Sequence, residues 1–344
     1  MYDDRIFQKF VKERNVREST INGYKCALTH YTKFTKKDLK ELLDEAYEDE
    51  NKHLPLKERR IKKKLLRYRN HLLRTSSSPN TVKSYFTRVK SFYRHFDVEI
   101  PHLPDAKYEK LYEINYLDLP TKEHIKSALN VSTVEVRSII LFMSSSGTAK
   151  AETLSITVEQ FLDACRDYHH GGNIREILSS LKDRDDIIPT LYLRRIKTDK
   201  YYYTFCSPEA SSEIIKYLLT RPGLKLKDPL FDIPESTLLT RFQEINDSMG
   251  WGFKGKYRFF RAHTLRKFHA SNIGLSAEII DELQGRSKNE VHDTYIKPNP
   301  VELKRVYKNA MKRVMIHTED DKKINQEFTI VINVFLSGKE YNIL

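Results

Sequence analysis

A histidine and an arginine in the last third of the chain have a spacing that suits phosphate chemistry. They lie three residues apart in the segment Arg261-Ala-His263-Thr-Leu-Arg266, so on a helix both side chains share one face. A fixed guanidinium can clamp two oxygens of one phosphate, and an imidazole beside it can pass a proton. The pair therefore indicates a phosphate site.

A lysine stands at a turn further upstream. Two runs rich in β-branched and aromatic residues, 187–196 and 201–206, flank the polar tetrad Lys197-Thr198-Asp199-Lys200. This pattern predicts a β-hairpin with Lys197 at its turn.

The order of these features resembles the tyrosine recombinase, or phage integrase, family. HTLR at 263–266 is followed by LQGR at 283–286, and Tyr295 comes nine residues after that motif. The phrases KTDKYYYTFCSPEA and HDTYIKPNPVEL are most similar to the archaeal branch, which includes integrases of viruses and plasmids. The resemblance covers nearly the whole chain.

The resemblance implies a role for each of these residues. Tyr295 is the nucleophile, which attacks a DNA phosphodiester to give a 3′-phosphotyrosyl link and a free 5′-hydroxyl. Arg266 clamps non-bridging oxygens, His263 assists proton transfer, and Lys197 is the general acid for the leaving 5′-oxygen. Arg286 stands where the family usually has His or Trp. The covalent link conserves the bond energy, so neither ATP nor any other cofactor nor a metal is expected.

One residue of the family's pattern is missing. The first arginine of the family follows a glycine and precedes a glutamate by three positions, which corresponds to Ala149 between Gly147 and Glu152. Lys150 is the nearest cation and is our candidate replacement, although lysine lacks the bidentate fork. Three explanations stay open: the reaction tolerates lysine, the protein is a weakened or inactive relative, or an arginine was replaced to trap a DNA complex.

Other reaction motifs are missing from the sequence. It has no GxxxxGK[ST], GxGxxG or GxSxG segment. Asp167, His169 and His170 precede two glycines without a suitably spaced fourth ligand, which favours a surface loop over a metal site. No apolar run approaches the 18 residues of a membrane span, and the start, MYDDRIFQKF, lacks the apolar region of a signal peptide.

Positive charge is concentrated in the first third of the chain. The formal net charge is +13, and residues 1–100 contain 24 Lys and Arg against 14 Asp and Glu. Residues 57–74 carry nine cations and one glutamate, on a helical pattern with an apolar stripe. Such cations repel one another unless a partner neutralises them, which favours contact with DNA phosphates. The candidate DNA-binding residues are Arg59, Arg60, Lys62, Lys63, Lys64, Arg67, Arg69, Lys83, Arg88 and Lys90.

Periodicity predicts a mainly α fold with a small antiparallel β-sheet. A helical core-binding domain is expected over 1–105, a proline-containing linker over 106–120 and the catalytic domain over 121–317. A β-rich tail is expected over 318–344. The helical pattern at 300–315 suits either packing on its own domain or contact with a neighbouring protomer.

These features predict a site-specific DNA recombinase or integrase that works on double-stranded DNA as a homo-oligomer, a dimer or a tetramer. The alternative is a non-catalytic DNA-binding relative that keeps the fold. An RNA-binding or nuclease-type enzyme would need an acidic metal cluster that the sequence does not offer. The expected location is the cytoplasm, associated with the nucleoid, or the host cell if a virus encodes the protein.

Overall fold

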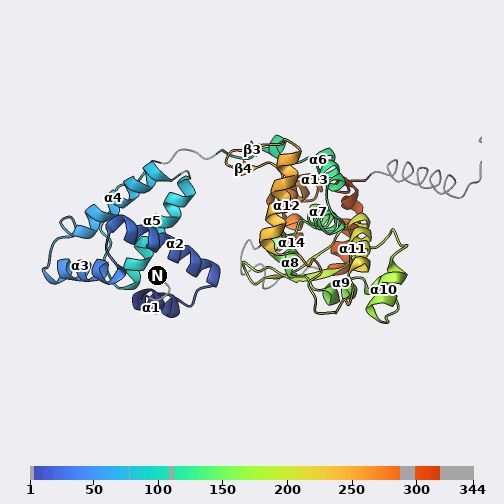
Figure 1. Ribbon diagram of the computed structural model, residues 1–344, viewed down its shortest axis with the longest axis horizontal. Coiled ribbons are helices and arrows are strands. Elements are labelled where there is room, and N and C mark those ends of the chain that lie inside the picture. Colours follow the sequence, from blue (N-terminus) through green and yellow to red (C-terminus); the bar gives the residue numbers. More distant parts are fainter. Residues whose placement is uncertain (1–3, 77, 108–111, 287–298, 318–344) are drawn as a thin grey trace, which may run out of the picture. The chain divides into compact units, whose positions relative to one another are not determined.

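The computed structural model describes residues 4–76, 78–107, 112–286 and 299–317 (Figure 1). The chain divides into two compact units, Met1–Tyr112 and Glu113–Leu344. The predicted mainly helical fold with a small antiparallel sheet is confirmed, and each unit has its own hydrophobic core.

The first unit is helical throughout its described part. Its helices are α1 (Arg5–Arg14), α2 (Glu18–Thr35), α3 (Leu39–Asn51), α4 (Arg60–Thr75) and α5 (Pro79–His95). Apolar residues at three- and four-residue steps along α4, such as Ile61, Leu65 and Leu72, are buried. Tyr31 and Tyr93 are also buried, and their hydroxyls form a hydrogen bond of 3.1 Å. Buried aromatic rings therefore form part of the core of this bundle.

The second unit surrounds one buried helix, α7 (Val134–Ser146), which lies at its middle (Figure 1). The other α-helices of its described residues are α6 (Lys122–Asn130), α8 (Lys150–Ser155), α9 (Val158–Ala164), α10 (Ile174–Leu181), α11 (Pro208–Thr220), α12 (Glu235–Ser248), α13 (Ala262–Asn272), α14 (Ala277–Leu283) and α16 (Pro300–Ala310). Short 3-10 turns occur at Tyr116–Asp118, Arg166–Tyr168 and Met311–Arg313. Every residue from Ser138 to Ser146 is buried, and α6, α8, α11 and α13 pack against α7.

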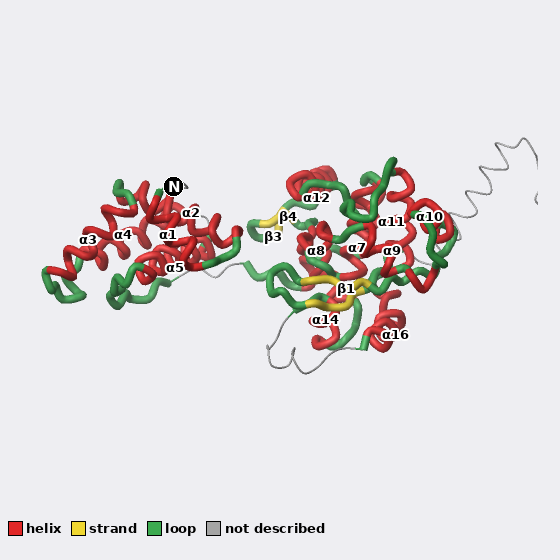
Figure 2. Tube along the Cα trace, turned by 90° about the horizontal axis from the view of Figure 1, so that it is seen from below, coloured by secondary structure: helices red, strands yellow, loops and turns green. Residues whose placement is uncertain are grey.

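The predicted hairpin is present but shorter than expected. Strands β1 (Leu191–Arg194) and β2 (Tyr201–Thr204) pair antiparallel, with Leu191 opposite Thr204 (Figure 2). The apolar residues before Leu191 are buried without joining the strand, because Pro189 has no N–H to donate to a ladder. A second small hairpin, β3 (Phe253–Lys254) with β4 (Tyr257–Arg258), was not predicted.

Helix α16 packs on its own unit. The hydroxyl of Tyr307 is buried and donates to the carbonyl oxygen of Ser145 in α7, 3.0 Å away. Of the two alternatives for this segment, the structure therefore has the self-packed one. The predicted tail strand over 318–344 lies outside the described residues.

Candidate active site

Helix α13 carries both residues of the HxxR motif. Its first turn is fixed by Thr264, whose hydroxyl donates to the carbonyl oxygen of Phe259 at 3.0 Å and accepts from the backbone N–H of Arg261 at 3.1 Å. With the start of the helix fixed, Arg266 is buried and His263, three residues earlier, reaches the surface.

Arg266 is held by two backbone carbonyls from distant parts of the chain. Its Nη1 donates to the oxygen of Gly147 at 2.6 Å, and its Nη2 donates to the oxygen of Gln284 at 2.9 Å. Burial lowers its pKa to about 10, helped by the charges of Arg195 and Arg286. The guanidinium stays protonated at neutral pH and is already oriented before any ligand arrives.

Gly147 makes this arrangement possible. It is the C-cap of α7 with φ +68°, a conformation that favours glycine. A Cβ at this position would lie 2.4 Å from Nδ1 of the buried His269. The close approach of α13 to the end of α7 therefore depends on a residue with no side chain.

His263 lies among cations. Partial loss of solvent around the ring lowers its pKa to about 4. The positive charges of nearby side chains act in the same direction: Arg261, Lys267, Arg266 and Arg286. The imidazole is therefore neutral at pH 7 in the absence of ligand, so it can accept a proton.

Arg286 follows the last turn of α14. Its backbone N–H donates to the carbonyl oxygen of Asp281 at 2.8 Å, and its Nη1 lies 3.4 Å from the Asp281 carboxylate. Gly285, with φ +62°, packs on the ring of Tyr202 in β2. The loop after α14 thereby packs on the hairpin. The positive charge of Arg286 lowers the pKa of both Arg266 and His263, so it lies near them.

Lys197 lies in the exposed turn between β1 and β2, as predicted. The backbone N–H of Arg195 donates to the oxygen of Lys200 at 2.7 Å and closes this turn. Lys200 Nζ lies 2.8 Å from Glu282 of α14, so the turn is held beside the residues that precede Arg286.

A cavity of about 380 Å³ opens beside Arg266. Its lining includes Ala149, Lys150, Arg261 and His263. Lys150 Nζ lies 2.6 Å from Glu235 at the start of α12, so its charge is already paired. Ala149, the position at which the resemblance predicts an arginine, lines this cavity with a methyl group only.

The predicted nucleophile, Tyr295, lies outside the described residues. The description stops at Arg286 and resumes at Asn299. The structure therefore brings together His263, Arg266 and Arg286, with the Lys197 turn attached to α14.

Comparison with known proteins gives fold similarity alone. No family model and no curated protein matches the sequence. A lambda integrase tetramer bound to a Holliday junction matches with a TM-score of 0.54 at 14% identity, covering 85% of this chain and 77% of that one. A lambda integrase(75-356) dimer bound to a COC′ core site matches with a TM-score of 0.54 at 13% identity, covering 85% of this chain and 95% of that one.

The chain has the tyrosine recombinase fold. On this fold the cluster of His263, Arg266 and Arg286 is the candidate active site. Within the described ranges, no group of three or more His, Cys, Asp or Glu side chains converges as metal ligands, and no helix has the length and apolarity to cross a membrane.

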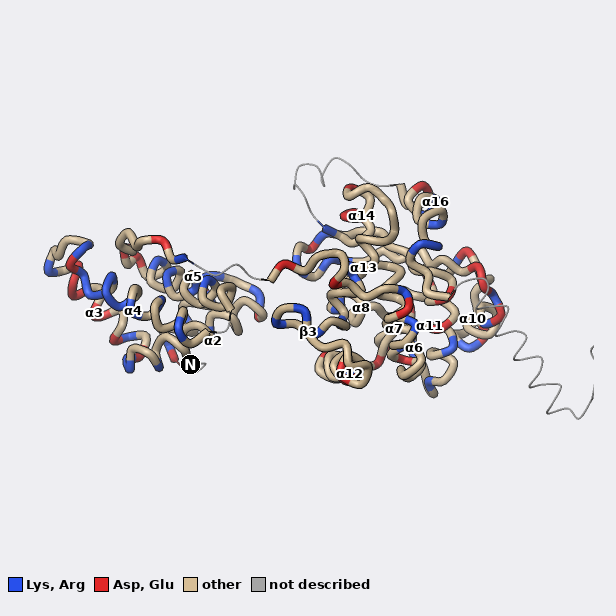
Figure 3. The backbone as a smooth tube through the Cα atoms, turned by 90° about the horizontal axis from the view of Figure 1, so that it is seen from above, with Lys and Arg blue, Asp and Glu red and all other residues tan. Residues whose placement is uncertain are grey.

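Several basic residues at the start of α4 form ion pairs with acidic residues of α3, which was not predicted. Arg60 Nε lies 2.7 Å from Asp49, Lys64 Nζ lies 2.6 Å from Glu45, and Arg59 also forms an ion pair with an acidic residue of α3. Figure 3 marks the acidic positions along α3 and the basic positions along α4, which packs against it. The expectation that these cations need an external partner is therefore wrong for part of the set.

Other predicted DNA-binding residues remain available at the surface. Lys63 and Arg67 are exposed, and neither side chain makes an ion pair or hydrogen bond within the part of the chain that the structure describes; the same is true of the half-buried Lys62 side chain. On α5, Lys83 is exposed and Lys90 Nζ lies 5.0 Å from the centre of the Phe86 ring. Lys62, Lys63 and Arg67 can therefore still contact phosphates.

Two predicted DNA-binding arginines have structural contacts. Arg69 is buried and donates from Nη1 to the carbonyl oxygen of Pro104, and Arg88 donates to the hydroxyl of Ser84. Arg69 thereby joins α4 to the segment after α5, whereas Arg88 pairs within α5.

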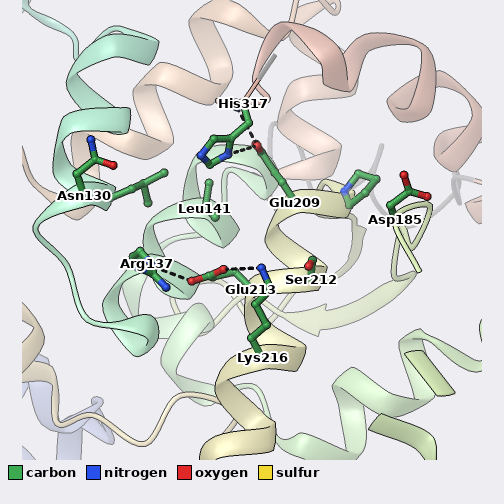
Figure 4. A pocket seen from close by; sticks show the side chains of 11 residues that line it. Asn130, Arg137, Leu141, Asp185, Glu209, Ser212, Glu213, Lys216 and His317 are labelled. Atoms are coloured by element: carbon green, nitrogen blue, oxygen red, sulfur yellow. Dashed lines mark hydrogen bonds and ion pairs between the residues drawn. The ribbon is translucent and has the colours of Figure 1, made fainter. Parts of the chain in front are cut away.

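Another cavity of the second unit, of about 330 Å³, lies at the start of α11 (Figure 4). Glu209 accepts hydrogen bonds from the backbone N–H groups of Ile316 and His317, at 2.8 and 3.0 Å. Arg137 Nε donates to Glu213 at 2.6 Å. Glu213 thus pairs with Arg137 and Lys216, and Glu209 contacts the His317 ring. No predicted site residue lines this cavity.

One charged pair at the active site was missed by sequence reasoning. Glu152 of α8 is buried, and its Oε2 lies 2.7 Å from Nη1 of Arg195, the residue directly after β1. The signal was available in the alternation of β1, where Leu191 and Leu193 point inward, because that alternation turns Arg195 inward as well.

Proposed function

We propose that this chain is a site-specific DNA recombinase or integrase that cleaves and rejoins DNA through a 3′-phosphotyrosyl intermediate. The observation that supports the proposal most strongly is Arg266. It is a buried cation fixed by two carbonyls, with His263 and Arg286 around it, on the fold of lambda integrase.

The proposed reaction exchanges one phosphoester bond for another. The hydroxyl oxygen of Tyr295 attacks phosphorus, and its proton passes to the neutral imidazole of His263. Arg266 and Arg286 meet the charge that develops on the non-bridging oxygens. The bond from phosphorus to the 5′-oxygen breaks, and Lys197 donates the proton that this oxygen takes up. Rejoining reverses these steps.

Binding to double-stranded DNA is proposed to use the basic residues of the first unit that have no internal ion pair, led by Lys62, Lys63 and Arg67. A homo-oligomer on DNA is proposed as well, because the similar lambda integrase structures are a tetramer on a Holliday junction and a dimer on a core site. Such a protein would work where the DNA is, at the nucleoid or in the host of a mobile element of archaeal type.

Covalent capture tests the proposal. The chain is incubated with a pool of random-sequence duplexes nicked near the middle, so that cleavage releases a short fragment and leaves the protein attached. A denaturation-resistant protein–DNA adduct is expected from the unchanged chain and not from Tyr295→Phe. Tyr201→Phe, which changes an exposed hairpin tyrosine, is the control and should still form the adduct.

A second function is favoured by Ala149. A protein that keeps the fold and the basic face but lacks one phosphate-binding arginine could bind DNA without cutting it. Retention of duplexes without any adduct, including from Lys150→Arg and Ala149→Arg, would support this second function.

A further inference from the structure

We propose that Arg195 supplies the guanidinium that is absent at position 149, and that it binds the scissile phosphate together with Arg266. This inference rests on the proposed function.

The position of Arg195 is set by α8, the helix that begins after Ala149. Ala149 is the N-cap and Glu152 is the third residue of this helix, so their side chains lie on the same side of its first turn. Glu152 Oε2 binds Nη1 of Arg195 at 2.7 Å, and its Oε1 accepts the backbone N–H of Ile196 at 3.1 Å. Two contacts to one carboxylate therefore hold the end of β1 against the helix that should carry the arginine.

Arg195 also lies close to Arg266. After burial, the charge of Arg195 is the largest cause that lowers the pKa of Arg266 to about 10. The buried hydroxyl of Tyr202, which has no hydrogen-bond partner among the described residues, lies near enough to both guanidinium groups for their charges to lower its pKa. Two neighbouring like charges are stabilised by an anion between them, and a phosphate diester is such an anion.

The side chain of Arg195 has N–H donors that form no hydrogen bond with the described residues. It is 17% exposed, and its Nη1 pairs with Glu152, while no hydrogen bond from its Nε or Nη2 forms within the described residues. Lys150 is a weaker candidate because it already pairs with Glu235 and offers a point charge without a fork. Arg195 can therefore give two N–H groups to one phosphate while Glu152 keeps the guanidinium in place.

The test measures the rate of covalent adduct formation on a nicked duplex that the unchanged chain captures. Arg195→Ala is expected to lower this rate by about 10²- to 10³-fold, the usual loss for one oxyanion donor, and Arg195→Lys is also expected to be slow. Arg194→Ala is the matched control. It removes the same charge one residue away, where the side chain is exposed and pairs with Asp199, and it should leave the rate unchanged.

A methylphosphonate at the scissile position separates phosphate binding from a structural role. This group lacks the charge that Arg195 is proposed to meet, so Arg195→Ala should lose about tenfold or less on it. Adding Ala149→Arg to Arg195→Ala should recover about tenfold or more on ordinary DNA. Arg195→Ala with Glu152→Gln, which leaves no unpaired buried carboxylate, should unfold at the temperature of the unchanged chain and still be slow.

The inference is overturned if Arg195→Ala cleaves ordinary DNA as fast as the unchanged chain. It is also overturned if the variant loses the same factor on both substrates, since that result assigns a structural role to Arg195. Failure of the unchanged chain to form any adduct overturns the proposed function, and this inference with it, so the two failures are distinguishable.

Discussion

The Nη1 group of Arg266 donates a 2.6 Å hydrogen bond to the carbonyl oxygen of Gly147, although 119 positions separate the two residues. Gly147 ends the central helix, and Arg266 is the cation on which the proposed chemistry depends. The orientation of the guanidinium is therefore built into the junction between α7 and α13.

Replacing Gly147 is expected to destabilise the second unit. Gly147→Ala places an L-residue at φ +68° and a Cβ 2.4 Å from Nδ1 of His269, which together should cost about 2–4 kcal/mol. Gly223→Ala is the control, because Gly223 has a similar φ of +62° and no atom within 4 Å of its would-be Cβ. Urea unfolding measures both. Equal losses would show that close packing at Gly147 contributes nothing.

Acid is expected to destabilise the second unit through His269. Burial lowers the pKa of this histidine to about 3, below the usual 6.5 that it regains on unfolding. The unfolded chain therefore binds more protons between these values, so stability falls as the pH drops from 6.5 towards 3, by about 1.4 kcal/mol per pH unit.

His269→Gln removes the titrating group and keeps a polar partner for Gln284, which lies 3.0 Å from the His269 ring. Chemical denaturation at several pH values should show a shallower acid slope for this variant. Identical slopes for the variant and the unchanged chain would exclude His269 as the source.

His263 is expected to titrate far below an ordinary histidine in the free protein. Its pKa is lowered to about 4, mainly because the protein removes solvent from around the ring and secondarily because cations lie nearby. Nuclear magnetic resonance should follow the ring, and Arg286→Ala should raise the midpoint. Added salt should raise it as well, because the cationic part of the effect is screened. A midpoint at or above 6.5 would contradict the neutral imidazole in the proposed mechanism.

The basic residues of α4 are expected to differ in their effect on DNA binding. Lys63→Gln and Arg67→Gln should each reduce the slope of log affinity against log salt by about 1, since each removes one phosphate contact. Lys64→Gln is the control, because Lys64 Nζ is paired with Glu45 at 2.6 Å, and it should change the slope less. Fluorescence anisotropy with a labelled duplex measures these slopes. An equal effect from all three variants would mean that the ion pair with Glu45 does not reduce the contribution of Lys64 to DNA binding.

Much of the fold could be predicted because long helices carry a period in their apolar residues. The helical patterns at 57–74 and 300–315, for example, became α4 and α16. The short helices α8, α9 and α10 were not, because six to eight residues give too few repeats for periodicity to detect. The hairpin was predicted too long because a buried apolar run looks like a strand whether or not it pairs.

The candidate site was harder to predict than the fold. His263, Arg266 and Arg286 were found because they lie in motifs with fixed spacing. The ion pairs of α4 with α3 and of Arg195 with Glu152 join segments that no motif links, so only the folded chain reveals them. The assignment of Lys150 to the place of the missing arginine stays a prediction.

Mass spectrometry of the captured adduct gives the most direct test of the proposed chemistry. After digestion of protein and DNA, a nucleotide should remain attached to the peptide that contains Tyr295, through the tyrosine oxygen and a 3′-phosphate. An adduct on another residue, a 5′-phosphate link, or no adduct from any captured duplex would contradict the proposal.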